Sequence, residues 1–195
     1  MNIKSYAIAL TALITLTTTA CSRKVTRIDP GEQIDLSGRW NNTDSRLAAE
    51  QLTGQILTER WLEDHNKEKK ERPTVIVGMI TNKSHEHIDA ETFTKDIEQS
   101  FVRTSTVRLV QGGEKRAAIR AERADQQTNA STTTMKQFGL ERGADYMLQG
   151  NISSIVDSQK RQKVVYYQIN LELTNLETNE IVWIGDKKIA KYVKN

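Results

Sequence analysis

The feature that most constrains the fold is a two-residue alternation of apolar and polar side chains near the C-terminus. Residues 164–174 carry this alternation, and its apolar members are Val165, Tyr167, Ile169, Leu171 and Leu173. A period of two places all of these side chains on one face of a β-strand. Residues 146–156 also have strand composition, and residues 175–180 have the composition of a turn before a partner strand at 181–193. The pattern predicts an antiparallel three-strand meander with one packed face and one wetter face.

The segments before the meander alternate between the periods of a helix and of a strand. A helix is expected from Thr43 or Asp44, both good N-caps, to about Asp64, with apolar residues recurring at steps of four. Residues 73–81 are almost continuously apolar and β-branched, which is typical of a central strand covered on both faces. Together the two segments indicate a sheet with helical cover.

A hydrophobic staple marks the start of a second helix. Ile88, Asp89 and Phe93 occupy the N′, N-cap and N4 positions of this motif, so a helix is expected to start at Asp89. A strand near residues 106–111 should follow, and then a charged, mostly solvated helix near residues 114–127.

A short helix through Met135 and Phe138 is expected to end at Gly143, because glycine is the usual left-handed residue after a helix. The full order of segments predicts a single α/β domain. Its sheet should be mixed and largely antiparallel, with the three-strand meander at the C-terminal end and about four covering helices.

The first twenty residues have the layout of a secretory signal peptide. Lys4 is followed by an apolar stretch at residues 6–16 and by small residues up to Cys21, the only cysteine of the chain. The apolar stretch rises about 16 Å as a helix, roughly half of a hydrocarbon core, which argues against a permanent span. The sequence before Cys21 resembles the lipobox of bacterial lipoproteins, although Thr18 stands where leucine is usual. We expect Cys21 to be acylated; the alternative is ordinary cleavage after Ala20, which would export an unpaired thiol.

Acyl chains on Cys21 would hold the mature protein on a membrane without spanning it. Ser22 stands where an aspartate would resemble the inner-membrane retention signal of enteric bacteria, so we expect attachment to the outer membrane, facing the periplasm. After the signal peptide at 1–20, residues 21–42 are predicted to form a short tether and residues 43–195 the globular domain. A fully extended tether reaches at most about 70 to 75 Å.

Charge and motifs argue for a binding module. Loss of the signal peptide leaves 27 basic and 25 acidic residues, so nothing in the charge requires nucleic acid as a partner. Ser84-His85-Glu86-His87 is the first candidate for metal binding, but two histidines do not make a site, and we expect an exposed connection without metal. No phosphate-binding loop or nucleophile motif is present, so we expect no catalytic residues, no cofactor and no enzymatic activity.

Arg39 and Trp40 are the candidate partner-binding residues, because arginine and tryptophan are favoured anchors in protein interfaces. The alternative is that Trp40 folds back and caps the core beside the first helix.

Several segments resemble one family of envelope proteins. The stretch from Leu36 to Arg46, the helix ending near Trp61, residues 82–101 and the closing hairpin at 178–183 are similar to the LpoB-type penicillin-binding-protein activator lipoproteins. The final hairpin is shared with the curli secretion channel lipoprotein and with the amino-terminal domain of TolB. The resemblance implies a periplasmic α/β domain that docks on a class A penicillin-binding protein, a bifunctional peptidoglycan synthase, and stimulates it by contact.

The tether departs from the pattern of the enteric activator, which carries a long proline-rich segment, whereas the tether here contains only Pro30. Two alternatives therefore remain open. One is a self-assembling envelope lipoprotein like the curli channel subunit, and the other is a lipoprotein that binds a different envelope component.

Overall fold

The computed structural model describes residues 23–136 and 139–194 and divides the chain into two units, Met1–Glu32 and Gln33–Asn195. Every described helix and strand lies in the second unit. This unit begins at Gln33, earlier than the domain boundary that the sequence predicts at residue 43.

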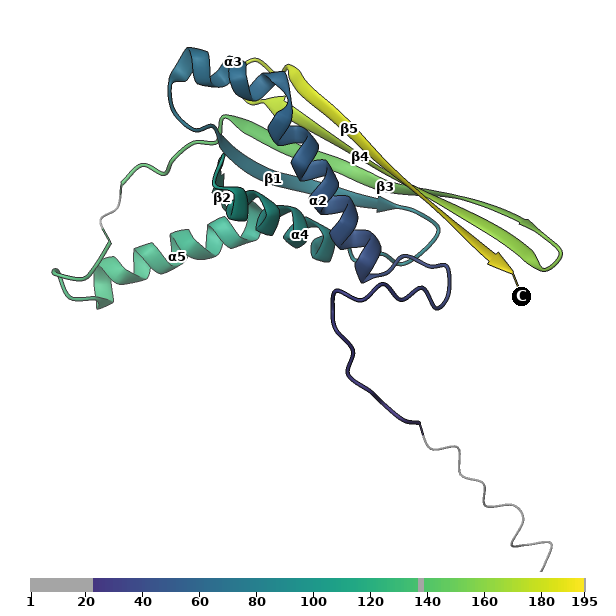
Figure 1. The fold of residues 1–195 in the computed structure, drawn as a ribbon. Helices are drawn as coiled ribbons and strands as arrows, with labels where there is room; N and C mark the ends of the chain where they lie inside the picture. Colours follow the sequence, from purple (N-terminus) through teal and green to yellow (C-terminus); the bar gives the residue numbers. More distant parts are fainter. Residues whose placement is uncertain (1–22, 137–138, 195) are drawn as a thin grey trace, which may run out of the picture. The chain divides into compact units, whose positions relative to one another are not determined.

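Five strands form one mixed sheet in the order β2-β1-β3-β4-β5 (Figure 1). β1 (Thr74–Lys83) pairs in parallel with β2 (Arg108–Val110) and with β3 (Tyr146–Gln159). β3, β4 (Gln162–Asn175) and β5 (Ile181–Lys194) are antiparallel neighbours. The prediction of a mixed sheet that ends in a three-strand meander is confirmed.

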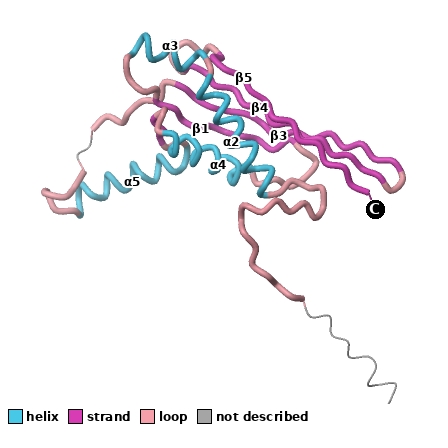
Figure 2. The backbone as a smooth tube through the Cα atoms, in the orientation of Figure 1, coloured by secondary structure: helices cyan, strands magenta, loops and turns pink. Residues whose placement is uncertain are grey.

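Two helices, α2 (Asn42–Thr58) and α4 (Ala90–Thr104), cover one face of the sheet (Figure 2). α4 starts at the predicted cap, where Oδ1 of Asp89 accepts a hydrogen bond from the amide of Glu91 at 2.9 Å. The alternating residues of β4 all face these helices and are at most 1% exposed: Val165, Tyr167, Ile169, Leu171 and Leu173. The predicted packed face is therefore confirmed.

The prediction of one continuous helix from residue 43 to residue 64 is wrong. The backbone is extended at Glu59, and a separate helix, α3 (Arg60–Lys69), follows. Trp61 stabilises the break, because its indole N–H donates to the carbonyl of Ile56 at 2.7 Å. Its ring packs edge-on against Tyr146 with the ring centroids 5.0 Å apart, so the break leaves the indole both buried and hydrogen-bonded.

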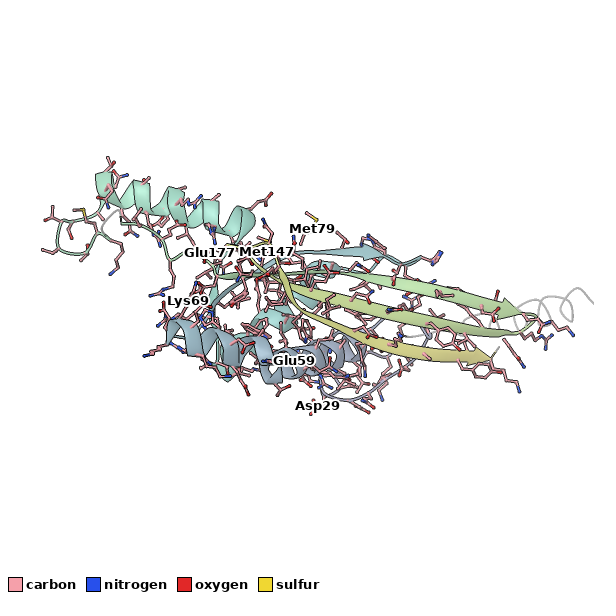
Figure 3. All side chains as sticks on the ribbon, turned by 90° about the horizontal axis from the view of Figure 1, so that it is seen from above. Asp29, Glu59, Lys69, Met79, Met147 and Glu177 are labelled. Carbon is pink, nitrogen blue, oxygen red and sulfur yellow. The ribbon has the colours of Figure 1, made fainter. Side chains whose placement is uncertain are left out.

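The charged helix α5 (Gly113–Asn129) has no buried residue, as its composition predicts. Figure 3 shows it on the side of the strands away from α2. The prediction of a short helix after α5 is wrong for the residues that the structure describes. Phe138, which the predicted helix included, lies outside the described residues. Instead the carbonyl of Ser131 accepts hydrogen bonds from the amides of Thr134 and Met135, and residues 139–143 have no regular structure. Serine and threonine side chains in this run bond locally and compete with a helix.

The expectation that the strand at 73–81 is covered on both faces holds only for its first half. Residues 74–77 of β1 are buried, but Met79 is 71% exposed. The pairing register with β3 shifts between Val77 and Ile80, and Met79 lies within this shift. Figure 3 shows Met79 and Met147 on the side of the strands away from α2, the side on which α5 has no buried residue.

Candidate partner-binding surface

Residues Gln33–Asn41, here called the N-terminal strap, belong to the folded unit and position Trp40 against the core. The Trp40 ring packs edge-on against Phe93 and Tyr167, with ring centroids 6.2 and 5.5 Å away. Its amide donates to Oε2 of Glu86 at 3.2 Å. The half-buried Trp40 thus caps the core beside α2, and a role for it in partner binding stays a prediction.

A lysine from the opposite end of the chain holds the strap in place. The ammonium of Lys191, whose side chain is 9% exposed, lies 2.6 Å from Oδ1 of Asp35 and 2.6 Å from Oδ2 of Asp44. It also donates to the carbonyl of Arg39 at 3.0 Å. Burial alone would lower the pKa of Lys191, but the bonds to Asp35 and Asp44 hold this pKa above its ordinary value. The network is a charge-compensated clamp between the strap, α2 and β5.

The other predicted residues are placed differently. The Arg39 side chain is exposed on the strap, next to the Lys191 clamp, and its role in partner binding stays a prediction. Cys21 lies outside the described residues, so its acylation also stays a prediction.

The segment with alternating histidines serves as a structural connection between β1 and α4. His85 and His87 are both exposed, as expected for a loop. The amide of His85 donates to Oγ of Ser154 at 3.0 Å, and Nδ2 of Asn82 donates to the carbonyl of Glu86 at 2.8 Å. Within residues 23–136 and 139–194, no three histidine, cysteine or acidic side chains are grouped closely enough to hold a metal ion.

Glu86 from this loop joins the strap to the sheet. Besides accepting from the amide of Trp40, its carboxylate lies beside the hydroxyl of Tyr167. Burial raises the pKa of Tyr167, and the Glu86 carboxylate raises it further. The hydroxyl donates its proton to the carbonyl of Gly38 at 3.4 Å, so the strap is fixed from the sheet as well.

The meander extends beyond α2 and α4, and its far end is here called the distal arm, residues 155–166 and 188–194 (Figure 1). One face of the arm continues the packed face of β4. The opposite, open face carries two cross-strand rows, in which Tyr166 stands between Ile155 and Ala190, and Val164 between Asp157 and Tyr192. Three of its apolar side chains are well exposed: Ile155 at 69%, Tyr166 at 50% and Tyr192 at 59%.

Cations surround this apolar centre. On the side of the open face they are Lys188 and Lys194, with Lys160 and Arg161 at the hairpin turn, whereas Lys163 and Lys191 have the register of the packed face. Asp157 is the one acidic residue of the arm. Lys188 lies 3.8 Å from Asp186 just outside the arm. In the described part of the chain, Lys160, Arg161 and Lys194 form no ion pair. The open face is therefore an exposed apolar and aromatic centre with a basic border.

The sequence pattern contained a signal for this surface. Val164 and Tyr166 interrupt the polar half of the alternation, whereas Gln168, Asn170 and Glu172 follow it. Where successive residues are apolar, both faces of a strand are apolar, and the pattern does not tell whether the second face is covered. The clamp at Lys191 had no such signal, because its partners are far away in sequence.

In the described residues, no helix is long and apolar enough to cross a membrane.

Comparisons with known proteins agree with the resemblance. The family model described as "Peptidoglycan-synthase activator LpoB" matches residues 44–189. The LpoB C-terminal domain from Escherichia coli is 16% identical with a TM-score of 0.46, covering 76% of this chain and 99% of that chain. The domain from Salmonella enterica is 16% identical with a TM-score of 0.43, covering 75% and 98%. Lipoprotein GNA1162 from Neisseria meningitidis is 13% identical with a TM-score of 0.38, covering 62% and 83%.

A search of the curated proteins finds no match. The family match nevertheless extends from the first turn of α2 into β5 and so includes every strand of the sheet. The chain belongs to the LpoB family of peptidoglycan-synthase activators.

Proposed function

We infer that this chain is an outer-membrane lipoprotein, anchored through Cys21 and facing the periplasm, that docks on a class A penicillin-binding protein and stimulates its glycosyl-transfer and cross-linking activities. The family match over residues 44–189 carries this proposal. Activation proceeds by contact, because binding that favours the active conformation of the synthase raises its rate without chemistry in the activator.

The placement of the strap sets how far the domain reaches from its anchor. Because the folded unit begins at Gln33, only the residues between Cys21 and Gln33 remain as a spacer between the anchor and the domain. Even fully extended, that spacer spans about 40 Å, less than the reach expected for the whole tether at 21–42. The proposal therefore requires the synthase to present its docking surface close to the membrane that holds the lipoprotein.

The test is reconstitution with the acylated mature protein in detergent. Each class A synthase of the host is incubated with lipid II, with and without the lipoprotein, and both glycan-chain formation and peptide cross-links are measured. We expect one synthase to turn over faster in proportion to the lipoprotein bound. No binding and no change of rate with any of these synthases would reject the proposal, and ring-shaped oligomers in detergent would favour a channel-like function instead.

Anchoring is tested separately with Cys21→Ser. We expect this variant to leave the membrane fraction and to lack acyl chains by mass spectrometry, while unanchored protein still activates the synthase in solution. Unchanged membrane fractionation and processing of Cys21→Ser would contradict acylation, but not activation by contact.

A further inference from the structure

The open face of the distal arm is the surface of this domain best built to hold a partner. Its apolar side chains lie in two adjacent rows of a continuous three-strand ladder, in which Tyr166 is paired with Ile155 and Val164 with Tyr192. Backbone hydrogen bonds on both sides of β4 hold these rows, so binding costs little ordering entropy. Because the opposite face at Val165 and Tyr167 is fully buried, the arm cannot rotate its open face inward.

The composition of this face matches that of a protein interface. Two tyrosines and an isoleucine form the exposed centre, and an arginine and two lysines that lack ion pairs among the described residues lie around it. Tyrosine and arginine are enriched in the centres of protein interfaces, whose rims are polar. The neighbouring rows continue as hydrogen-bonding side chains, where Nε2 of Gln168 donates to Oδ1 of Asn170 at 2.9 Å.

The charge of the arm selects among occupants. Pairing with a second copy would bring together two faces with the same excess of positive charge, which is repulsive. A lipid surface would meet the polar hairpin turn at 159–162 first, while the exposed Ile155 and Tyr192 are set back from that turn along the strands. A protein surface with an acidic rim around an apolar hollow would pair with the cations and would also bury the aromatic centre that lies behind the turn.

We propose that the open face of the distal arm docks on an acidic, apolar-centred protein surface of the peptidoglycan synthase, with Tyr166, Tyr192 and Ile155 at the centre of the contact. This proposal rests on the proposed function above for the identity of the partner. The cations at the hairpin turn steer the encounter, so the association rate should fall as salt increases.

Two pairs of variants separate the apolar centre from the basic border. Ile155→Ala with Tyr192→Ala removes exposed apolar contacts, and Ile184→Ala is its control, since Ile184 is 63% exposed and lies outside the arm on β5. Lys160→Glu with Arg161→Glu reverses the charge at the turn. Its control is Arg60→Glu with Lys67→Glu, an equal charge change on the exposed side of α3.

Affinity and stimulation are measured with the full acylated lipoprotein in detergent and the synthase that the wild type activates. We expect each arm variant to weaken binding by at least tenfold, and stimulation at limiting lipoprotein to fall in parallel. The charge variant should also lose most of the salt dependence of the association rate. Both controls should bind within about twofold of the wild type, and the urea midpoints of all variants should stay close to that of the wild type.

The outcomes distinguish the two proposals. Arm variants that bind and stimulate like the wild type would overturn the docking surface while leaving the proposed function intact. A wild type that binds no synthase would overturn both. Two further results would also overturn the docking proposal, provided that the arm variants keep full affinity for the synthase. Loss of binding to vesicles containing phosphatidylglycerol would assign the surface to a lipid, and loss of self-association in sedimentation would assign it to a second copy.

Discussion

Replacing Lys191 with methionine tests the clamp that holds the N-terminal strap. Methionine keeps most of the buried stem of the lysine but removes the ammonium that lies 2.6 Å from Asp44 and 2.6 Å from Asp35. The Asp35 side chain is 57% exposed and water can solvate it, so its loss of a partner costs little. The Asp44 side chain is only 8% exposed and would keep a single hydrogen bond, from the amide of Asn41 at 2.9 Å. Leaving a buried charge without its partner costs about 3 kcal/mol.

Urea unfolding followed by tryptophan fluorescence measures this loss, because Trp40 lies on the strap and should change its environment. We expect Lys191→Met to lower the free energy of unfolding by about 3 kcal/mol. Lys188→Met, an exposed lysine on the same strand, should change it by less than about 0.5 kcal/mol. Adding Asp44→Asn to Lys191→Met should restore part of the loss, since no charge is then left buried. Equal effects of Lys191→Met and Lys188→Met, or strict additivity in the double variant, would refute the clamp.

Two glycines and one carboxylate give further predictions. Gly54→Ala should raise the free energy of unfolding by about 0.5 to 1 kcal/mol, because Gly54 lies in α2 with open space where a Cβ would stand. Gly150→Ala should lower it by about 2 kcal/mol or more in the same urea assay, since its Cβ would overlap the carbonyl of Asn170; a neutral result would contradict the close strand approach. Burial alone would raise the pKa of Asp145, but its bonds to the Thr74 amide and to Lys69 hold this pKa below its ordinary value. The stability contributed by the Asp145 carboxylate is therefore present above about pH 4 and is lost as the pH falls through the lowered pKa. The difference in urea midpoint between the wild type and Asp145→Asn should accordingly shrink in acid. A difference that does not depend on pH would contradict a contribution from the ionised carboxylate.

Local patterns predicted the elements whose signals lie within a few residues. The alternation at 164–174 and the staple at Asp89 each specify one geometry, and the structure has both. The break at Glu59 was missed because apolar spacing continues across it, and only the contact of Trp61 with Tyr146 explains why two helices pack better than one. The described residues after α5 show the opposite case, because they form no helix and their local serine and threonine hydrogen bonds outweigh a weak apolar spacing.

The candidate partner-binding surface likewise has features that the sequence predicts and features that only the tertiary structure shows. Arginine and tryptophan at 39–40 were predicted as interface residues from their types alone, and the structure packs Trp40 into the domain by contacts with residues far along the chain. The open face of the distal arm could be suspected from Val164 and Tyr166, but a strand pattern does not say whether a helix covers it. Only the tertiary structure shows that α2 and α4 both lie on the opposite face of the sheet, and that α5 buries no residue, so this face of the arm stays bare (Figure 2).

The sequence by itself determined the mixed α/β class, the meander and the family, because hydrophobic periodicity, caps and motifs are properties of neighbouring residues. Only the tertiary structure decided that the strap from Gln33 is part of the domain, that Lys191 joins Asp35 to Asp44, and that the distal arm is uncovered. The physical reason is that burial and charge compensation depend on which distant segments meet, and that meeting is set by the packing of the whole domain.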